Sequence, residues 1–174
     1  MIQLKDVCMT FGKKVALDHI NLTIQDGETL AIIGGSGSGK STLLRLLIGL
    51  IKPTSGKIWI DGDEITHMTE KELDTVRMRM GMVFQYSALF DSMTVGENVA
   101  FGLEEHTKKK KTEIERIVKE KLHLVGLDGV ENLMPSELSG GMKKRVGLAR
   151  AIAIEPEVIL YDEPSSGLDP IMTE

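Results

Sequence analysis

The chain has little of what stabilises secreted or membrane-spanning proteins. One cysteine, Cys8, occurs among 174 residues, so no internal disulfide can form and a reducing compartment is the expected setting. No apolar run approaches the ~20 residues of a membrane-spanning helix, because Arg45 interrupts the leucine-rich stretch 43–51. The first residues alternate like a strand and predict no signal peptide. We expect any work at a membrane to be done from its cytoplasmic side, through a partner.

The chain also has no excess of basic residues and few aromatic residues. The formal net charge is −5, which argues against a nucleic-acid partner bound by bulk electrostatics. A basic run at 108–111 is followed at once by Glu113 and Glu115, which indicates a solvated helix start. Aromatic residues make up 4 % of the chain, and one of them, Phe11, precedes a predicted hairpin. Local sequence favours a core position for Phe11 over stacking on an adenine ring.

The stretch that organises the rest is 29–42, T-L-A-I-I-G-G-S-G-S-G-K-S-T. An apolar run at 30–33 predicts a strand, a glycine-serine loop follows, and leucines at helical spacing come next. Residues 34–41 match G-x-x-x-x-G-K-[ST], the phosphate loop, in the context that gives the motif its meaning. A chance glycine-serine turn would not place lysine and serine in register between a strand and a helix.

This loop has the residue types that a triphosphate requires. Glycines allow backbone N–H groups to approach phosphate, and a helix N-terminus adds its unpaired N–H groups. Lys40 supplies a charge to the β and γ phosphates, and Ser41 offers a hydroxyl to Mg²⁺. The predicted ATP-binding residues here are Gly34, Gly35, Ser36, Gly37, Ser38, Gly39, Lys40, Ser41 and Thr42.

Three later stretches carry further candidate groups. Gln85 ends an apolar strand predicted at 81–84, where α/β proteins place ligand-facing groups. The strand predicted at 158–161 ends in Asp162 and Glu163, which suit a Mg²⁺ ligand and a general base for the attacking water. Residues 138–142, L-S-G-G-M, open a helix whose N-terminus suits an anion, with an ordinary N-cap as the alternative.

These motifs, in this order and rough spacing, resemble the nucleotide-binding domain of ABC transporters. They correspond to its Walker A, Q-loop, signature, Walker B and D-loop motifs, the last at 166–169, and the resemblance runs from about Phe11 to the C-terminus. It implies an α/β P-loop NTPase fold with an N-terminal antiparallel β subdomain and an inserted helical lobe. The chain would be one ATP-binding domain, 1–174, with a catalytic core at 1–85 and 156–174 and a helical lobe with signature helix at 86–155.

The resemblance also implies roles for these residues. Two copies would pair head to tail, each ATP lying between residues 34–41 of one copy and Ser139, Gly140 and Gly141 of the other. Catalysis would fall to Glu163, Gln85 and Lys40, and the Mg²⁺ ligands would be Ser41, Gln85 and Asp162. Phe11 would stack on adenine, where the family usually has tyrosine.

Met142, where most family members have glutamine, and the following K-K-R-V-G-L-A-R-A are similar to the ATPases of Mla/MCE-type phospholipid transport. The partners implied are a second ATPase subunit, an integral membrane permease and an MCE lipid-binding subunit. The protein would lie on the cytoplasmic face of the inner or plasma membrane.

The sequence departs from the family at its end. It stops at Glu174, and no histidine (His19, His67, His106 or His123) lies where the family has its switch histidine. We therefore expect an incomplete central sheet and a poorly stable isolated chain.

Four other functions are consistent with a phosphate loop in a chain of this size. A nucleotide-binding module without turnover and an importer ATPase of another branch stay open. A DNA-repair or chromosome ATPase is disfavoured, because the chain has no coiled-coil insertion, no zinc-binding cysteines and an acidic balance. A GTPase is disfavoured because no Asn-Lys-x-Asp motif is present.

Overall fold

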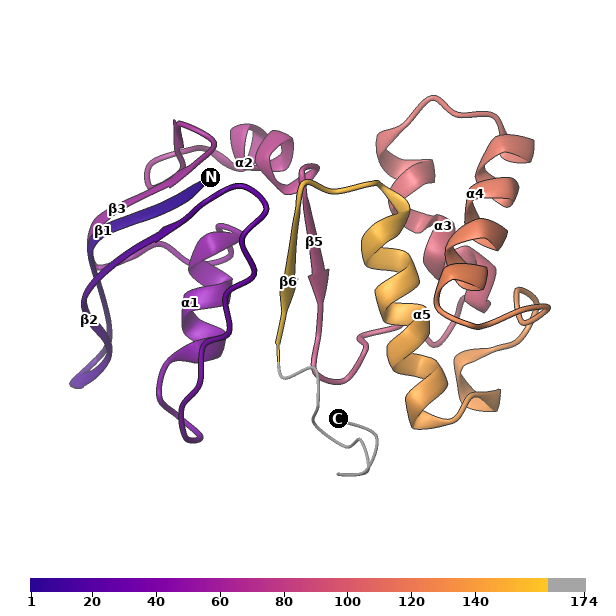
Figure 1. Ribbon diagram of the computed structural model, residues 1–174, viewed down its shortest axis with the longest axis horizontal. Helices are drawn as coiled ribbons and strands as arrows, with labels where there is room; N and C mark the ends of the chain where they lie inside the picture. Colours follow the sequence, from indigo (N-terminus) through magenta and orange to yellow (C-terminus); the bar gives the residue numbers. More distant parts are fainter. Residues whose placement is uncertain (163–174) are drawn as a thin grey trace. The chain divides into compact units, whose positions relative to one another are not determined.

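The computed structural model describes residues 1–162 of the chain, in two compact units, Met1–Arg77 and Met78–Glu174 (Figure 1). The first unit is mostly antiparallel β-sheet and the second mostly helical. The division into a catalytic core and a helical lobe at residues 86–155 stays a prediction. Of the residues predicted above, Glu163 and the stretch 166–169 lie outside the described residues.

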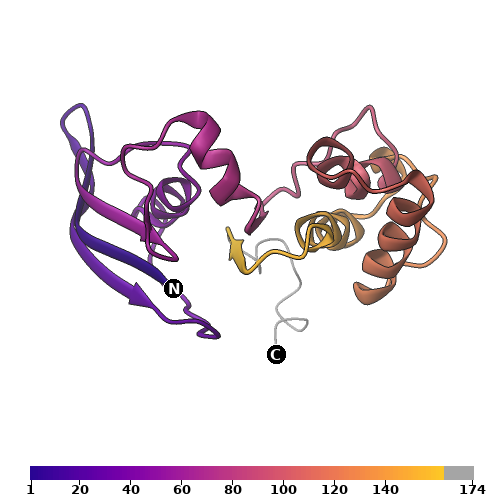
Figure 2. The same ribbon diagram turned by 90° about the horizontal axis from the view of Figure 1, so that it is seen from above.

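The sheet of the first unit has strand order β2-β1-β3-β4. Its members are β1 (Ile2–Phe11), β2 (Lys14–Ile24), β3 (Ser55–Ile60) and β4 (Asp63–Glu64). Polar and apolar residues alternate along β1 and β3, which buries one face, including Leu4, Val7 and Ile58. Helix α1 (Lys40–Leu47) lies on one side of this sheet, with Leu46 almost fully buried (Figure 2).

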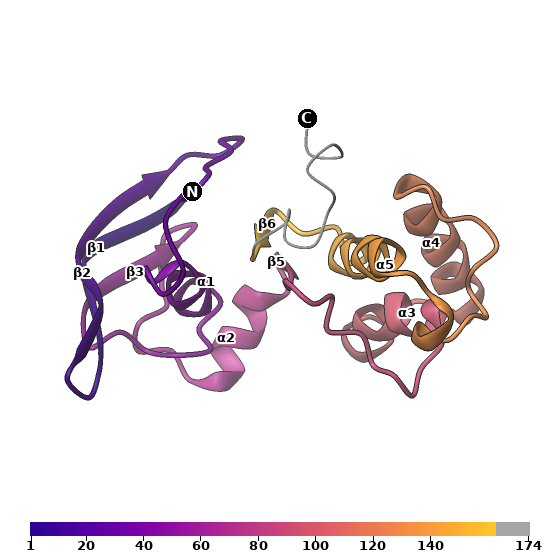
Figure 3. The ribbon, with the colours of Figure 1, turned by 90° about the horizontal axis from the view of Figure 1, so that it is seen from below.

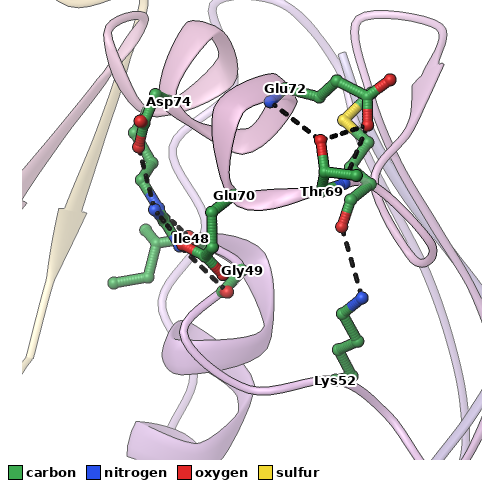
Figure 4. A network of polar contacts seen from close by, with 9 residues as sticks. Ile48, Gly49, Lys52, Thr69, Glu70, Glu72 and Asp74 are labelled. Atoms are coloured by element: carbon green, nitrogen blue, oxygen red, sulfur yellow. Dashed lines mark hydrogen bonds and ion pairs between the residues drawn. The ribbon is translucent and has the colours of Figure 1, made fainter.

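Helix α2 (Glu70–Arg77) ends the first unit, and both of its ends are anchored by side chains. Thr69 and Glu72 form a capping box, with the Thr69 N–H donating to the Glu72 carboxylate at 2.8 Å and the Glu72 N–H donating to the Thr69 hydroxyl at 3.4 Å. Arg77, in the last turn, donates to the carbonyl oxygens of Ile48 at 3.0 Å and Gly49 at 3.1 Å (Figure 4). These bonds fasten α2 to the segment that follows α1.

The strand predicted at 30–33 is wrong for the described structure. Among residues 1–162 this segment pairs with no strand, and Ile33 is 95 % exposed. The apolar run satisfies the pattern of a buried strand, but a strand forms only where a neighbour accepts and donates its backbone hydrogen bonds. Asp26 and Gly27 lie in a turn that is closed by the Glu28 N–H donating to the Gln25 carbonyl at 3.1 Å. Because residues 30–33 form no strand, this turn does not connect two strands.

The second unit pairs β5 (Met80–Val83) with β6 (Val158–Tyr161) in parallel. Its helices are α3 (Val95–His106), α4 (Lys111–Leu124) and α5 (Gly140–Ala153), with a 3₁₀ turn η1 (Pro135–Glu137). The three helices pack around one another (Figure 3). Their core is made of aliphatic side chains that recur at helical spacing, among them Val95, Val99, Leu103, Ile114, Val118, Leu122, Val146 and Ala149.

The predicted strand at 158–161 is confirmed, but it is less buried than its apolar sequence suggests. Leu160 is 7 % exposed, whereas Ile159 and Tyr161 are 39 % and 42 % exposed. Within the described residues β6 has a hydrogen-bonded neighbour on one side, β5. No helix in the part of the chain that the structure describes is both long and apolar enough to cross a membrane.

Candidate phosphate-binding loop and associated polar groups

The phosphate loop, residues 34–42, consists of the loop at 34–39 and the first turn of α1 at 40–42. Gly39 precedes the helix in the left-handed region, at φ 96°, and its carbonyl oxygen accepts the first helical bond from Leu43 N–H at 2.9 Å. The Ser38 N–H donates to the Gly35 carbonyl at 3.2 Å, which tightens the loop before the helix begins. The helix has no acidic residue in its first turn, so nothing there repels an anion.

Two glycines in the loop are required by its geometry. A Cβ on Gly39 would lie 2.5 Å from the carbonyl oxygen of Ala16 on β2, so only glycine lets the loop rest against that strand. Gly37 also has positive φ, at 78°. The loop is open at Gly35, where a Cβ would meet nothing within 4 Å, whereas a Cβ on Gly34 would lie 2.6 Å from the Ser38 hydroxyl oxygen. An exposed glycine backbone next to a helix N-terminus fits a phosphate chain.

Two lysine ammonium groups lie at this loop. Lys40 Nζ donates to the carbonyl oxygens of Gly34 at 2.7 Å and Gly35 at 3.0 Å. Lys14 Nζ lies 4.0 Å from the position that a Cβ on Gly37 would take. Lys14 was not among the predicted site residues, because its sequence position indicates only a turn. Its relation to the loop arises from the β1–β2 hairpin.

Phe11 is not a core residue. It ends β1 opposite Lys14 in the hairpin register, and its side chain is 49 % exposed. The local prediction of a core phenylalanine is therefore wrong, because β1 reaches past the buried face of the sheet before it turns. Phe11 and Lys14 share the hairpin end from which Lys14 reaches the phosphate loop. An exposed aromatic face there is available for stacking.

In the second unit, two of the predicted polar residues follow neighbouring strands. Gln85 comes two residues after β5 and Asp162 directly after β6, and the parallel register pairs Val83 with Tyr161. The Asp162 N–H donates to the Val83 carbonyl at 3.0 Å, which continues the ladder by one bond. The structure thus brings Gln85 and Asp162 to the same carboxyl edge of this pair of strands, as parallel pairing requires.

The turn after Gln85 is held by Arg150 of α5. Its guanidinium donates to the carbonyl oxygens of Ala88 at 2.7 Å and Ser87 at 2.8 Å. Ser87 and Ala88 have positive φ, at 60° and 46°, a conformation that needs external support in residues other than glycine. Burial lowers the pKa of Arg150, because the charged form loses water. Sequence patterns gave no signal for this arginine, whose role depends on the packing of α5 against the turn.

Ser139 is the N-cap of α5, and its hydroxyl oxygen accepts from the Met142 N–H at 3.2 Å. A Cβ on Gly140 or Gly141 would meet nothing within 4 Å, so the first turn is open at both residues. The ordinary N-cap that the sequence allows is confirmed. In this N-cap the Ser139 oxygen accepts a hydrogen bond, so its hydroxyl proton can still be donated to an anionic ligand at the open helix N-terminus.

The candidate residues therefore divide between the two units. The first unit holds Phe11 and residues 34–42, and the second holds Gln85, Ser139–Gly141 at the start of α5, and Asp162. The first set suits a base and a phosphate chain. The second suits a hydrated cation at Gln85 and Asp162, since amide and carboxylate oxygens are preferred Mg²⁺ ligands.

Comparison with known proteins gives a consistent result. The family model described as ABC transporter matches residues 17–166. The probable ribonucleotide transport ATP-binding protein mkl of Mycobacterium leprae is 50 % identical over 172 residues, which are 99 % of this chain and 50 % of that protein. The intermembrane phospholipid transport system ATP-binding protein MlaF of Escherichia coli K12 is 50 % identical over 171 residues, 98 % of this chain and 64 % of that protein.

A solved structure matches the fold over nearly the whole chain. It is a dimeric post-hydrolysis state of the ATP-binding cassette MJ0796 bound to ADP and Pi, 36 % identical in sequence. The superposition has a TM-score of 0.91 and covers 98 % of this chain and 77 % of the other. The chain spans about half to two thirds of the length of the curated relatives named above.

Proposed function

This chain belongs to the ABC transporter ATP-binding family, and from that premise we propose that it binds and hydrolyses ATP to power the transport of phospholipids. The observation that carries the proposal is the phosphate loop at 34–42, with open glycine backbone, two lysines and a helix N-terminus without acidic residues. The solved relative bound to ADP and Pi supports the same ligand class.

In this proposal the loop binds the phosphates and Phe11 stacks on the adenine. Lys40 exchanges its bonds to Gly34 and Gly35 for the β and γ phosphate oxygens. Ser41, Gln85 and Asp162 would hold Mg²⁺, which supplies charge neutralisation at the phosphates when bound. Glu163 positions and deprotonates the attacking water. A second copy contributes Ser139, Gly140 and Gly141 to the γ phosphate, so each site uses two chains.

The ATPase proposal is tested with two variants that separate binding from turnover. Lys40→Ala should lose nucleotide binding, whereas Glu163→Gln should keep it and lower turnover by about 10²–10⁴-fold. Turnover is measured by phosphate release in Mg-ATP, binding by a fluorescent ATP analogue, and pairing by light scattering. ATP-dependent dimers of Glu163→Gln with lost turnover would support the proposal.

Other outcomes would change the assignment. Binding that Lys40→Ala removes, without turnover in the unaltered chain, would favour a nucleotide-binding module. Turnover that persists in Lys40→Ala would contradict the proposed site.

Phospholipid is proposed as the transported substrate on the 50 % identity to the E. coli phospholipid transport protein and on the stretch that begins at Met142. The partners would be a membrane permease and an MCE subunit, and the chain would lie peripherally on the cytoplasmic face of the membrane. Equal identity to the mycobacterial ribonucleotide transport protein makes a nucleotide importer the second candidate.

Those two substrates are distinguished by purifying the tagged chain with its membrane complex in detergent. We expect phospholipid enrichment in the complex by mass spectrometry, relative to a tag-only control. ATPase stimulation by ribonucleotide without phospholipid enrichment would favour the importer.

A further inference from the structure

The β1–β2 hairpin of the first unit departs from regular register at three places, and the first two are adjacent. The first lies between the pairs Leu4↔Leu22 and Val7↔Ile20, where Lys5 and Asp6 of β1 stand opposite Asn21 of β2. The second lies between Val7↔Ile20 and Met9↔Leu17, where Cys8 of β1 stands opposite Asp18 and His19 of β2. Bulges of this kind redirect side chains that would otherwise alternate across the sheet.

Both bulges are held in a specific shape. Asp6 and His19 have positive φ, at 54° and 48°, which side-chain-bearing residues rarely adopt. Asn21 bridges them, because its Oδ1 accepts from the Asp6 N–H at 3.0 Å and its Nδ2 donates to the His19 carbonyl at 3.0 Å. On β3, a Cβ on Gly56 would lie 2.3 Å from the Asp6 carbonyl oxygen, so the neighbouring strand makes room for the bulge.

The bulges bring a thiol, a carboxylate and an imidazole together. One potential ligand atom each from Cys8, Asp18 and His19 lies within 4.8 Å of the other two, the one such trio found among residues 1–162. His19 Nε2 lies 3.8 Å from Asp18 Oδ1, and the His19 backbone N–H donates to Cys8 Sγ at 3.2 Å. His19 Nδ1 is engaged separately, 2.6 Å from Asp6 Oδ1.

From this arrangement we propose that Cys8, Asp18 and His19 bind one divalent transition-metal ion of the zinc class, with Asp6 as the positioning residue for His19. Thiolate and imidazole select zinc-like ions over Mg²⁺ and Ca²⁺, which prefer oxygen ligands. Asp6 accepts the Nδ1 proton and leaves Nε2 to the metal, the arrangement usual for a metal-bound histidine. A fourth position is open to water or another donor.

The ligand atoms need only small movements to close on an ion. Bond lengths of ~2.0–2.3 Å in a tetrahedral site place ligand atoms about 3.3–3.8 Å apart. The His19 and Asp18 side chains are 69 % and 78 % exposed, so both rotate without disturbing the core. Binding replaces the thiol proton of Cys8 by the metal, and the released proton goes to solvent. The competing account is a surface ion pair of His19 with Asp6 and Asp18 beside a free thiol.

The experiment is a Co²⁺ titration of the purified, chelator-stripped chain. We expect one Co²⁺ per chain, a thiolate-to-cobalt absorption band, and displacement of Co²⁺ by Zn²⁺. Cys8→Ser should abolish the band and His19→Gln should weaken binding at least about 10-fold. Asp6→Asn should weaken binding about 10–100-fold while keeping the band at saturation, as expected for a positioning residue.

His123→Gln is the matched control. His123 is similarly exposed, at 74 % against 69 % for His19, and pairs with Asp128 at 2.9 Å, but it lies outside the one ligand trio found among residues 1–162. Its Co²⁺ affinity should equal that of the unaltered chain. Folding of each variant is checked by circular dichroism. Absence of a stoichiometric band, or equal affinity in folded His19→Gln and His123→Gln, would overturn the proposal.

Discussion

At the scale of single residues, Asn98 shows how one buried amide organises a loop. Its side chain is fully buried in α3, and its Oδ1 accepts from the Phe90 N–H at 2.8 Å. Its Nδ2 donates to the carbonyl oxygens of Phe90, Met93 and Thr94 at 3.0–3.1 Å. One side chain therefore satisfies backbone groups that have left regular structure before α3 begins.

Asn98→Ala should destabilise the protein by about 2–5 kcal/mol, because it removes every hydrogen bond that this fully buried amide makes to the backbone of residues 90–94 and leaves a cavity. The free energy of unfolding in urea measures this. Asn132→Ala is the matched control, since Asn132 is exposed, and it should change stability by less than about 0.5 kcal/mol. Equal effects of the two substitutions would contradict the role given to Asn98.

Single residues also mark where sequence reasoning succeeded and failed. The N-cap Ser139 was predictable, because the preference for serine at the start of a helix is local. Lys14 and Arg150 were not, since their roles arise from contacts between segments far apart in the chain. Asn98 contacts only nearby residues, but the loop before α3 that it holds has no regular sequence pattern. The roles proposed for Lys40, Gln85 and Asp162 stay predictions until they are tested by substitution.

At the scale of elements, the start of α2 provides a pH-dependent contribution to stability. The Thr69 N–H, and then the Thr69 hydroxyl, donate to the Glu72 carboxylate and lower the pKa of Glu72. A lowered carboxyl pKa means that the folded state favours the ionised form. Its contribution is complete above the ordinary glutamate pKa and is lost as pH falls through the lowered value.

An NMR titration of the Glu72 carboxyl should therefore show a pKa below the ordinary glutamate range. Thr69→Ala should move this pKa only part of the way back, because the largest cause, the backbone N–H of residue 69, remains. In Glu72→Gln the acid-induced loss of stability should be smaller. An unshifted Glu72 titration would show that the capping box does not persist in solution.

A second element-scale prediction concerns residues 30–33, where sequence and structure disagree. Ile33→Ser should change the free energy of unfolding by less than about 1 kcal/mol, because its side chain is 95 % exposed. Leu46→Ala, at a side chain 1 % exposed, should cost about 2–5 kcal/mol. Thermal or urea unfolding of both variants decides this. A large loss in Ile33→Ser would mean that 30–33 is a buried strand in solution, as the apolar pattern predicted.

At the scale of the whole molecule, the predicted α/β fold class is confirmed, together with the strand at 158–161 and a strand at 80–83 where 81–84 was expected. Local sequence identified β6 from its apolar run, and the starts of α4 and α5 from residues 108–115 and 138–142. It could not predict the pairing of 30–33, since the same apolar run fits a strand whether or not a neighbour is present. The organisation into two compact units likewise depends on contacts that no local pattern records.

The bonds from Lys40 to the carbonyl oxygens of Gly34 and Gly35 have a consequence for the thermodynamics of phosphate binding. A phosphate entering the loop exchanges partners with an ammonium that is already bonded, so the net enthalpy gained per contact is smaller than the contact itself suggests. The same bonds keep the loop curved beforehand, which lowers the entropy lost on capture. We therefore expect the loop to gain less from the lysine contact itself, and to lose less entropy on binding, than a loop that only the nucleotide puts in order.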